Sequence, residues 1–378
     1  MTREEYKAAV MDMAYLAACA VNGDIPVASR ISKIDLPLLY WTADRHLLTG
    51  ITAIALESAG VHDKEFTQAK GKAIRKVATF DMERTAVLEA LEKAGIWYMP
   101  LKGSVLKDLY PMIGMRQMAD NDILYDASRT ADVRIIMEEL GFVTDKCFGR
   151  GVHDHYIKPP VCNFEMHRML FGVSHDNDLQ EYYQNVKEHL LQDEGRQYGY
   201  HFSSEDFYIY MIAHEYKHYS SGGTGIRSLL DTYVYLNRKG GALDWPYVTC
   251  ELKKLGIAGF EAQNRSLALH LFGGETLTGA DGKMLDYMCF SGTYGKVSNR
   301  VKNRIAKYGD GPFGKLRYVL SRIFLPMKVV RDYFPLFGKY PILLPFLPIY
   351  RLFRGLTSGR GRMRVELKEL AEYKSSRK

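Results

Sequence analysis

The chain has 378 residues, of which 47% are hydrophobic and 25% are charged. This length suffices for two or three compact units, and the composition excludes long-range disorder, collagen and a disulfide-stapled miniprotein. Five cysteines, none in a C-x-x-C pair, argue against a disulfide framework or a cysteine zinc site and indicate a reducing compartment.

Charge is distributed unevenly along the sequence. Residues 300–378 hold 19 Lys and Arg against 5 Asp and Glu, a balance of +14, so residues 1–299 carry −7 of the total of +7. Basic tails of this kind often contact phosphates, nucleic acid or anionic lipid. The first residues do not resemble a secretory signal, and the most apolar segment, 340–350, is interrupted by three prolines. We therefore expect a cytoplasmic protein without a transmembrane segment.

Residues 1–78 are expected to form a helical N-terminal region, with helices over 38–48 and 51–58 and no chemical motif. A stronger helix is predicted over 79–94, because Phe80, Val87 and Leu91 recur at helical spacing. Gly95 is expected to end this helix.

The hydrophobic period then changes, and residues 79–170 read as an α/β core. Short apolar or alternating runs predict strands over 96–101, 116–126, 142–147, 153–158 and 161–168, with helices over 105–110 and 130–140. The pattern predicts an α+β protein with a small mixed sheet that carries helices on one side.

Helical patterns dominate the remainder of the chain. Residues 171–299 are expected to form a helical domain, with helices over 179–191, 204–219, 226–236, 247–255, 259–271 and 281–288. Residues 300–378 form a basic, aromatic-rich C-terminal region. Its basic side chains are consistent with a membrane surface, an RNA backbone or another anionic partner, or with helices that pack on the body while Lys and Arg reach water. We favour packing for the apolar residues and leave the basic ones open.

Two short motifs carry the candidate chemistry. Asp120 and Asp122 are two positions apart on a predicted strand, so their side chains share a face about 6–7 Å apart. Carboxylates this close repel each other unless a proton or cation intervenes, and a pair of Mg²⁺ ions would satisfy both. Upstream, Gly103-Ser104 follows a predicted strand and opens a helix, where backbone N–H groups can cradle a polyphosphate.

Strand, Gly-Ser, short helix and Asp-x-Asp, in this order, resemble the polymerase-β-type nucleotidyltransferase superfamily. The run from Met99-Pro100-Leu101-Lys102-Gly103 through Tyr110-Pro111, Arg116, Asp120 and Asp122 is closer still to a family of uncharacterised bacterial nucleotidyltransferases. The resemblance covers roughly residues 79–240. The chain departs from the family pattern in two ways. The gap between Gly-Ser and the first Asp is longer than in the most compact members, and Asn121 stands where an apolar residue is usual. We expect Asn121 to face the other side of the sheet.

The resemblance implies a third carboxylate on a later strand, and Glu165 is the candidate. The run 161–168 alternates, so Asn163, Glu165 and His167 share a face. Glu165 would complete the metal site and act as general base towards the acceptor. The alternative is a salt-bridged surface strand. Lys102, Gly103, Ser104 and Arg116 would bind the nucleotide, although Arg116 could equally pair with Asp120.

A competing motif is His214-Glu215-Tyr216-Lys217-His218, which matches H-E-x-x-H, the beginning of a zinc peptidase site. A third ligand is required, and none is well placed in the sequence. The same stretch also resembles the helical domain that follows the sheet in the nucleotidyltransferase family. We therefore expect a polar cluster between two antiparallel helices, which contacts the nucleotide or fixes the packing. Its members would be His214, Lys217, His218, Arg227 and Asp231.

The sequence thus predicts transfer of a nucleoside monophosphate from a nucleoside triphosphate to an acceptor, with Mg²⁺, or Mn²⁺ in its place, as cofactor. The acceptor could be a small molecule, a sugar, a protein or RNA. The alternatives are a zinc hydrolase that uses His214, Glu215 and His218, and a catalytically inactive binding protein with the same fold.

Overall fold

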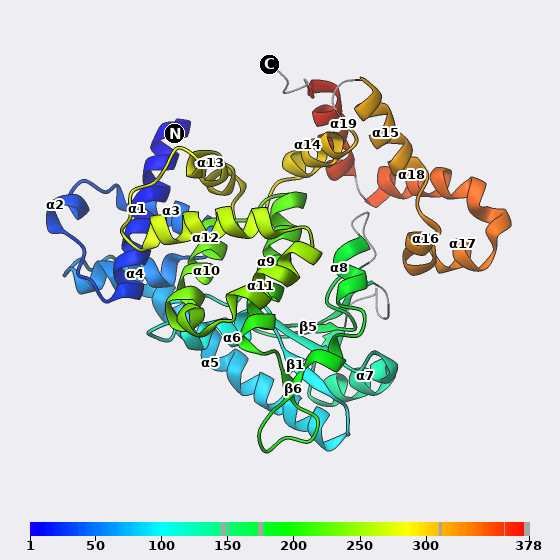
Figure 1. Ribbon diagram of the computed structural model, residues 1–378, viewed down its shortest axis with the longest axis horizontal. Helices are drawn as coiled ribbons and strands as arrows, with labels where there is room; N and C mark the ends of the chain where they lie inside the picture. Colours follow the sequence, from blue (N-terminus) through cyan, green and yellow to red (C-terminus); the bar gives the residue numbers. More distant parts are fainter. Residues whose placement is uncertain (145–148, 150, 173–176, 310–311, 359, 374–378) are drawn as a thin grey trace.

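The computed structural model of the chain describes residues 1–144, 149, 151–172, 177–309, 312–358 and 360–373. Figure 1 shows a body in which a sheet lies beside a set of helices, and a lobe built from the last helices that extends to one side. Within the described ranges, no helix combines the length and the apolar character needed to cross a membrane. The α+β architecture expected from the sequence is confirmed.

The N-terminal helices pack against helices from the middle of the chain. Thr2 and Glu5 form a capping box at the start of the first helix, and Gly23 ends it in a left-handed conformation. The apolar faces of these helices share one buried core with helices from residues 226–291. The N-terminal helices are α1 (Arg3–Asn22), α2 (Ala28–Ile31), α3 (Leu36–His46) and α4 (Thr49–Ser58).

Helix α5 (Lys64–Lys93) is longer than the sequence analysis predicted. It begins at Lys64 after the N-cap Asp63, so the predicted start at residue 79 is wrong. The apolar stripe continues towards the N-terminus through Phe66, Ala69 and Ala73, which pack into the body. Alanine is only weakly hydrophobic, so the regular spacing of apolar residues is hard to recognise in this half of the helix.

The sheet has five strands in the order β1-β2-β5-β4-β3, in which β2 and β5 are parallel and the other neighbours are antiparallel. The predicted strand over 116–126 was too long, because residues 111–120 form a loop before the strand begins. Part of the strand expected over 142–147 lies outside the described residues. The strands are β1 (Tyr98–Pro100), β2 (Asn121–Tyr125), β3 (Val143–Thr144), β4 (His153–Lys158) and β5 (Cys162–His167).

Different helices pack on the two faces of the sheet. Ile123 and Tyr125 share a buried cluster with residues of α5 and α7 (Thr130–Glu139), whereas Leu124 on the opposite face packs with residues of α9 (Ser204–Ser221). Asn121 is fully buried towards α5, where it accepts from Arg84 at 3.1 Å and donates to the Phe80 carbonyl at 3.2 Å. The expectation that Asn121 faces away from Asp122 is confirmed.

Between β1 and β2 the chain forms α6 (Gly103–Leu106) and the 3-10 turn η1 (Lys107–Leu109). After β5, the helix predicted over 179–191 is wrong, because α8 (Asn177–Tyr182) ends early and the chain forms η3 (Val186–His189) and a hairpin. The backbone N–H of Tyr98 in β1 donates to the backbone carbonyl of Tyr198 at 2.9 Å, which joins the sheet to this hairpin. The hairpin strands are β6 (Leu191–Gln192) and β7 (Tyr200–His201).

The remaining predicted helices are confirmed within a few residues at their ends. They are α9, α10 (Ile226–Lys239), α11 (Trp245–Lys254), α12 (Ala258–Phe272) and α13 (Asp281–Ser291), with the turn η4 (Gly240–Ala242) after α10.

The C-terminal region forms the lobe seen in Figure 1. Its small core consists of Val301, Ile305 and Tyr318. Packing of the apolar residues on the body, which we favoured, is wrong for many of them, because large side chains such as Phe313, Ile342 and Phe353 are exposed. The elements are α14 (Val297–Lys307), α15 (Pro312–Ile323), α16 (Met327–Tyr333), α17 (Pro335–Lys339), η5 (Pro341–Phe346), α18 (Leu347–Ser358) and α19 (Arg360–Glu372).

Candidate functional site

A cavity of about 400 Å³ lies between the polar face of the sheet and helices α9 and α10. Every candidate site residue predicted from the sequence lines it except Ser104, although the candidates come from separate parts of the chain. They are Lys102, Gly103, Arg116, Asp120, Asp122, Glu165, His167, His214, Lys217, His218, Arg227 and Asp231. The fold therefore gathers these residues around one space.

Three carboxylates line the cavity. Asp122 and Glu165 are direct partners across the parallel strands β2 and β5, and Asp120 immediately precedes β2. Asp120 is thus at the end of the loop and not on the strand as predicted. Burial, followed by the charges of Asp122 and Glu165, raises the pKa of Asp120 to about 6. This cluster concentrates negative charge that a bound cation would neutralise.

Asp122 is buried and already has two partners. Lys102 Nζ lies 2.7 Å and His167 Nε2 lies 2.8 Å from its Oδ1 atom. Burial opposes ionisation of this carboxyl, but the Lys102 ammonium and the His167 hydrogen bond outweigh it and lower the pKa. Asp122 is therefore ionised at neutral pH.

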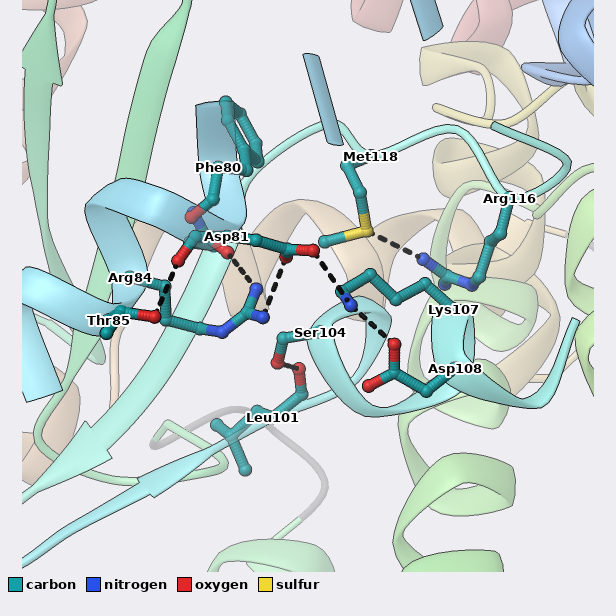
Figure 2. Close-up of polar contacts among 11 residues, drawn as sticks. Phe80, Asp81, Arg84, Thr85, Leu101, Ser104, Lys107, Asp108, Arg116 and Met118 are labelled. Carbon is teal, nitrogen blue, oxygen red and sulfur yellow. Dashed lines mark hydrogen bonds and ion pairs between the residues drawn. The ribbon is translucent and has the colours of Figure 1, made fainter. Parts of the chain in front are cut away.

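The Gly-Ser bend is held by its own backbone and by α5. Ser104 Oγ donates to the Leu101 carbonyl at 2.6 Å, as Figure 2 shows. Lys102 has a φ of +49°, a rare conformation for a residue with a side chain. Asp81 of α5 binds Lys107 of η1 at 3.1 Å, which ties the segment after the bend to the long helix. The bend is thus fixed before any ligand binds.

Arg116 is a buried anchor for the loop before β2. Its guanidinium makes a two-pronged contact with Asp231 of α10, with distances of 2.8 and 2.9 Å, and Tyr110 Oη donates to the same carboxylate at 2.8 Å. The partner of Arg116 is therefore Asp231 and not Asp120. Arg227, one turn earlier on α10, donates to the Gln117 carbonyl at 3.2 Å. These contacts hold residues 110–118 against α10.

The two histidines and the glutamate of the H-E-x-x-H motif on α9 all line the cavity, but the Glu215 carboxylate is bound to residues of other helices. His214 and His218 line the cavity with their Nε2 atoms 3.2 Å apart, and burial lowers the pKa of His218 to about 4. The carboxylate of Glu215 is bound by Asn264 at 2.9 Å and by Thr232 at 3.4 Å. A zinc hydrolase needs this glutamate beside the metal-bound water, so the geometry disfavours that alternative.

The sequence analysis overlooked two residues on β4, His153 and His155. In the antiparallel register His155 lies opposite Glu165 and His153 opposite His167, so all four side chains share one face. Burial lowers the pKa of His153 to about 4. The alternation His153-Asp154-His155 was a signal for these residues, but its relation to Glu165 depends on strand pairing that the sequence does not state.

The donor atoms suit a divalent cation. The carboxylates of Asp120, Asp122 and Glu165 offer the oxygen ligands that Mg²⁺ and Mn²⁺ prefer. Among the described residues, the one cluster of three or more His, Cys, Asp or Glu ligand atoms within 4.8 Å of one another is His153, Glu165 and His167. His214 and His218 therefore lack a third ligand of these types in the described part of the chain.

Comparison with known proteins adds a family to this geometry. Searches of curated proteins and of solved structures found no match. The sequence model of one family matches residues 32–273, a segment that contains all the cavity-lining candidates named above. The chain belongs to the family described as uncharacterised nucleotidyltransferase.

Proposed function

We propose that this protein transfers a nucleoside monophosphate from a nucleoside triphosphate to an acceptor and releases pyrophosphate. The observation that supports this most strongly is the pairing of Asp122 with Glu165 on parallel strands, with Asp120 immediately before β2, beside the Gly103 bend. The chain's family and its resemblance to the polymerase-β superfamily support the same reaction class.

Asp120, Asp122 and Glu165 would hold the divalent ions, with Mg²⁺ as the expected metal and Mn²⁺ as a substitute. When bound, such ions offset charge on the α-phosphate and on the departing pyrophosphate. The raised pKa of Asp120 supports this assignment, because a carboxyl that resists ionisation in the free protein gains most from a nearby cation.

Basic groups around the same cavity would bind the triphosphate. Lys102 lies beside Asp122, and the backbone of Gly103 and Ser104 turns at the cavity edge. Arg227 adds a buried positive charge from α10, and Arg116 contributes by fixing the loop that carries Asp120. These cations would orient the β- and γ-phosphates as a leaving group.

Glu165 is the proposed general base. Burial opposes its ionisation, but the neighbouring His167 imidazole lowers its pKa, so it is ionised and can accept a proton at neutral pH. The acceptor oxygen would form a bond to the α-phosphorus as the bond to the bridging oxygen breaks. Pyrophosphate leaves with that electron pair, and Glu165 takes the acceptor proton.

The cavity is large enough for a nucleotide, and its walls include Phe207 and Tyr210 beside the polar groups. His214, Lys217 and His218 face this space from α9. These residues would contact the base or the acceptor, which could be a small molecule, a sugar, a protein or RNA.

Thermal unfolding with Mg²⁺ and each of the four common nucleoside triphosphates tests the binding step. We expect at least one nucleotide to raise Tm by several degrees only when metal is present. The double variant Asp120→Asn/Asp122→Asn should lose this shift, whereas Asp108→Asn, whose carboxylate is exposed, should retain it. The absence of a metal-dependent shift with every nucleotide would contradict the proposal.

A further inference from the structure

We propose that His153, Glu165 and His167 bind a transition metal ion of the Zn²⁺ type at the edge of the cavity. The site would use two imidazoles and the carboxylate of Glu165, which is also one of the three carboxylates proposed for Mg²⁺. A metal ion bound here would add a second kind of metal to the cavity of the proposed nucleotidyltransferase. The evidence for this ion is the geometry of the three side chains.

The distances within this cluster fit metal ligands better than hydrogen bonds. Glu165 Oε2 lies 3.4 Å from His153 Nδ1 and 3.5 Å from His167 Nε2. Ordinary N–H···O bonds measure about 2.7–3.2 Å. Ligand atoms around a tetrahedral ion, with bonds of about 2.0–2.1 Å, lie roughly 3.3 Å apart. The observed spacing is therefore close to the spacing around a shared ion.

His153 carries a buried donor atom without another role. Its Nδ1 atom has no hydrogen-bond partner among the residues that the structure describes, although it is inaccessible to solvent. The other ring nitrogen, Nε2, lies 3.0 Å from His155 Nε2. We assign the proton of this pair to His153, which leaves a lone pair on Nδ1 directed towards Glu165. Metal-binding histidines are commonly fixed in this way through their second nitrogen.

Asp122 adjoins this cluster through its hydrogen bond with His167. Its Oδ1 atom lies 2.8 Å from His167 Nε2, so metal binding would replace the proton that these atoms share. Imidazole nitrogen favours Zn²⁺ and related ions, whereas Mg²⁺ favours oxygen ligands alone. The same sheet face thus presents a nitrogen-rich site that shares Glu165 with the oxygen-rich one.

Metal binding to the full chain tests this site without any enzymatic readout. Protein stripped with a chelator would be titrated with Zn²⁺ against a chromogenic competitor, and with Co²⁺ while its visible absorption is recorded. We expect one tight site per chain and a loss of affinity of at least tenfold in His153→Ala. The control His62→Ala removes an exposed histidine that does not line the cavity and should bind as the native chain does.

Two outcomes would overturn the metal site: equal Zn²⁺ affinity in His153→Ala and the native chain, or loss of the tight site in His214→Ala but not in His153→Ala. Circular dichroism would confirm that each variant is folded. The MgNTP stabilisation described above depends on Asp120 and uses no imidazole ligand. Its failure would therefore be distinguishable from a failure of Zn²⁺ binding.

A second inference concerns the C-terminal lobe and rests on a different observation. Helix α18 turns an apolar stripe to solvent, with side chains at i, i+3, i+4 and i+7 that share one helical face. Their exposed fractions are 66% for Ile349, 59% for Leu352, 68% for Phe353 and 45% for Leu356. Helix α15 repeats the pattern with exposed Phe313, Leu316 and Leu320.

We infer that this apolar surface docks onto an anionic lipid membrane. The stripe lies within a region of net charge +14, and exposed Arg354 belongs to the same helix. A helix that is apolar on one face and accompanied by Arg and Lys lies in the interface of a negatively charged bilayer. RNA would bind the cations without requiring the stripe, and a second copy of the chain would bring two strongly basic regions together.

Vesicle co-sedimentation of the full chain tests this docking. We expect binding to vesicles that contain phosphatidylglycerol, little binding to pure phosphatidylcholine, and weaker binding as salt rises. Leu352→Ser/Phe353→Ser should reduce binding to the anionic vesicles about tenfold or more. Ile135→Ser, which removes an exposed apolar side chain from the body, should bind unchanged.

Equal vesicle binding by the native chain and the double serine variant would overturn the inference. A concentration-dependent dimer that the double variant abolishes, seen by light scattering without lipid, would also overturn it and assign the surface to a second copy. Salt-sensitive RNA binding that survives the double variant, in the absence of vesicle binding, would assign the basic residues to nucleic acid instead.

Discussion

At position 103 the bend leaves no room for a side chain. A Cβ atom placed on Gly103 would lie 2.4 Å from Arg116 Nη1 and 3.0 Å from the sulfur of Met118. Arg116 cannot yield easily, because two hydrogen bonds hold it to Asp231. Gly103 is therefore required by the close approach of the arginine.

We predict that Gly103→Ala lowers the free energy of unfolding by about 1–3 kcal/mol, since the added methyl must displace a buried ion pair. Urea unfolding measures this change. Gly71→Ala is the matched control, because Gly71 lies within α5 and its new Cβ would meet only the flexible end of Arg75. There we expect a gain of up to about 1 kcal/mol. Equal effects at both positions would contradict this account.

The buried pair of Arg116 and Asp231 provides a second prediction. Asp231→Ala leaves the guanidinium of Arg116 and the hydroxyl of Tyr110 without their shared acceptor. We expect a loss of about 3–5 kcal/mol in urea unfolding. Asp12→Ala, which breaks the surface pair with Arg30, should cost less than about 1 kcal/mol. Similar losses in the two variants would mean that the buried pair stabilises the fold no more than the surface pair does.

The types of the site residues could be predicted, but several of their partners could not. Alternation along short strands placed Glu165 and His167 on one face of their strand and Asp122 on the face opposite to Asn121, because the period of two is a local property. The pairing of Arg116 with Asp231 and of His153 with Glu165 joins distant segments. Those contacts depend on how the chain folds back, so no local pattern contains them.

At the scale of the element, α9 has one face for the cavity and another for the core. Glu215 is buried at the edge of the cavity, and this burial raises its pKa from the usual 4.5 to about 7. The folded protein therefore binds this proton more tightly than the unfolded chain does. The contribution of Glu215 to stability is fully present below pH 4.5 and is lost as the pH rises through about 7.

We predict that Glu215→Gln does not lose stability as the pH rises through about 7, because glutamine cannot ionise. The pKa difference corresponds to about 3 kcal/mol, at about 1.4 kcal/mol for each tenfold change in proton affinity. Urea unfolding at pH 5 and pH 8 should show that the variant gains stability over the native chain at pH 8 and not at pH 5. A variant that is less stable than the native chain at pH 8 would show that the carboxylate itself is required.

Periodicity predicted the elements whose faces are chemically distinct. The strands β4 and β5 alternate in burial, and the helices α11 to α13 show their buried residues at helical spacing. The first half of α5 has small or charged residues at many positions, and β6 and β7 have two residues each, so neither carries a strong local signal. Their structure depends on packing against other elements.

The arrangement of the whole molecule goes beyond such local signals. The strand order places β5 next to β2, although β3 and β4 separate them in the sequence. This parallel pairing brings Glu165 to Asp122. The sequence could name Glu165 as a candidate, but it could not show that the two strands are neighbours. The domain boundaries at 78/79, 170/171 and 299/300 stay a prediction. Helix α5 spans the first of them, and α1 shares a core with α10 and α12.

The most direct test of the proposed transfer follows the α-phosphate. Native protein with Mg²⁺, nucleoside triphosphates labelled at either the α- or the γ-phosphate, and a cell extract as the source of acceptor would be separated and imaged. We predict that α-label moves onto an acceptor, that γ-label leaves as pyrophosphate, and that Asp122→Asn abolishes both. Transfer of the γ-label instead, or equal transfer of the α-label by Asp122→Asn, would contradict nucleotidyl transfer at this site.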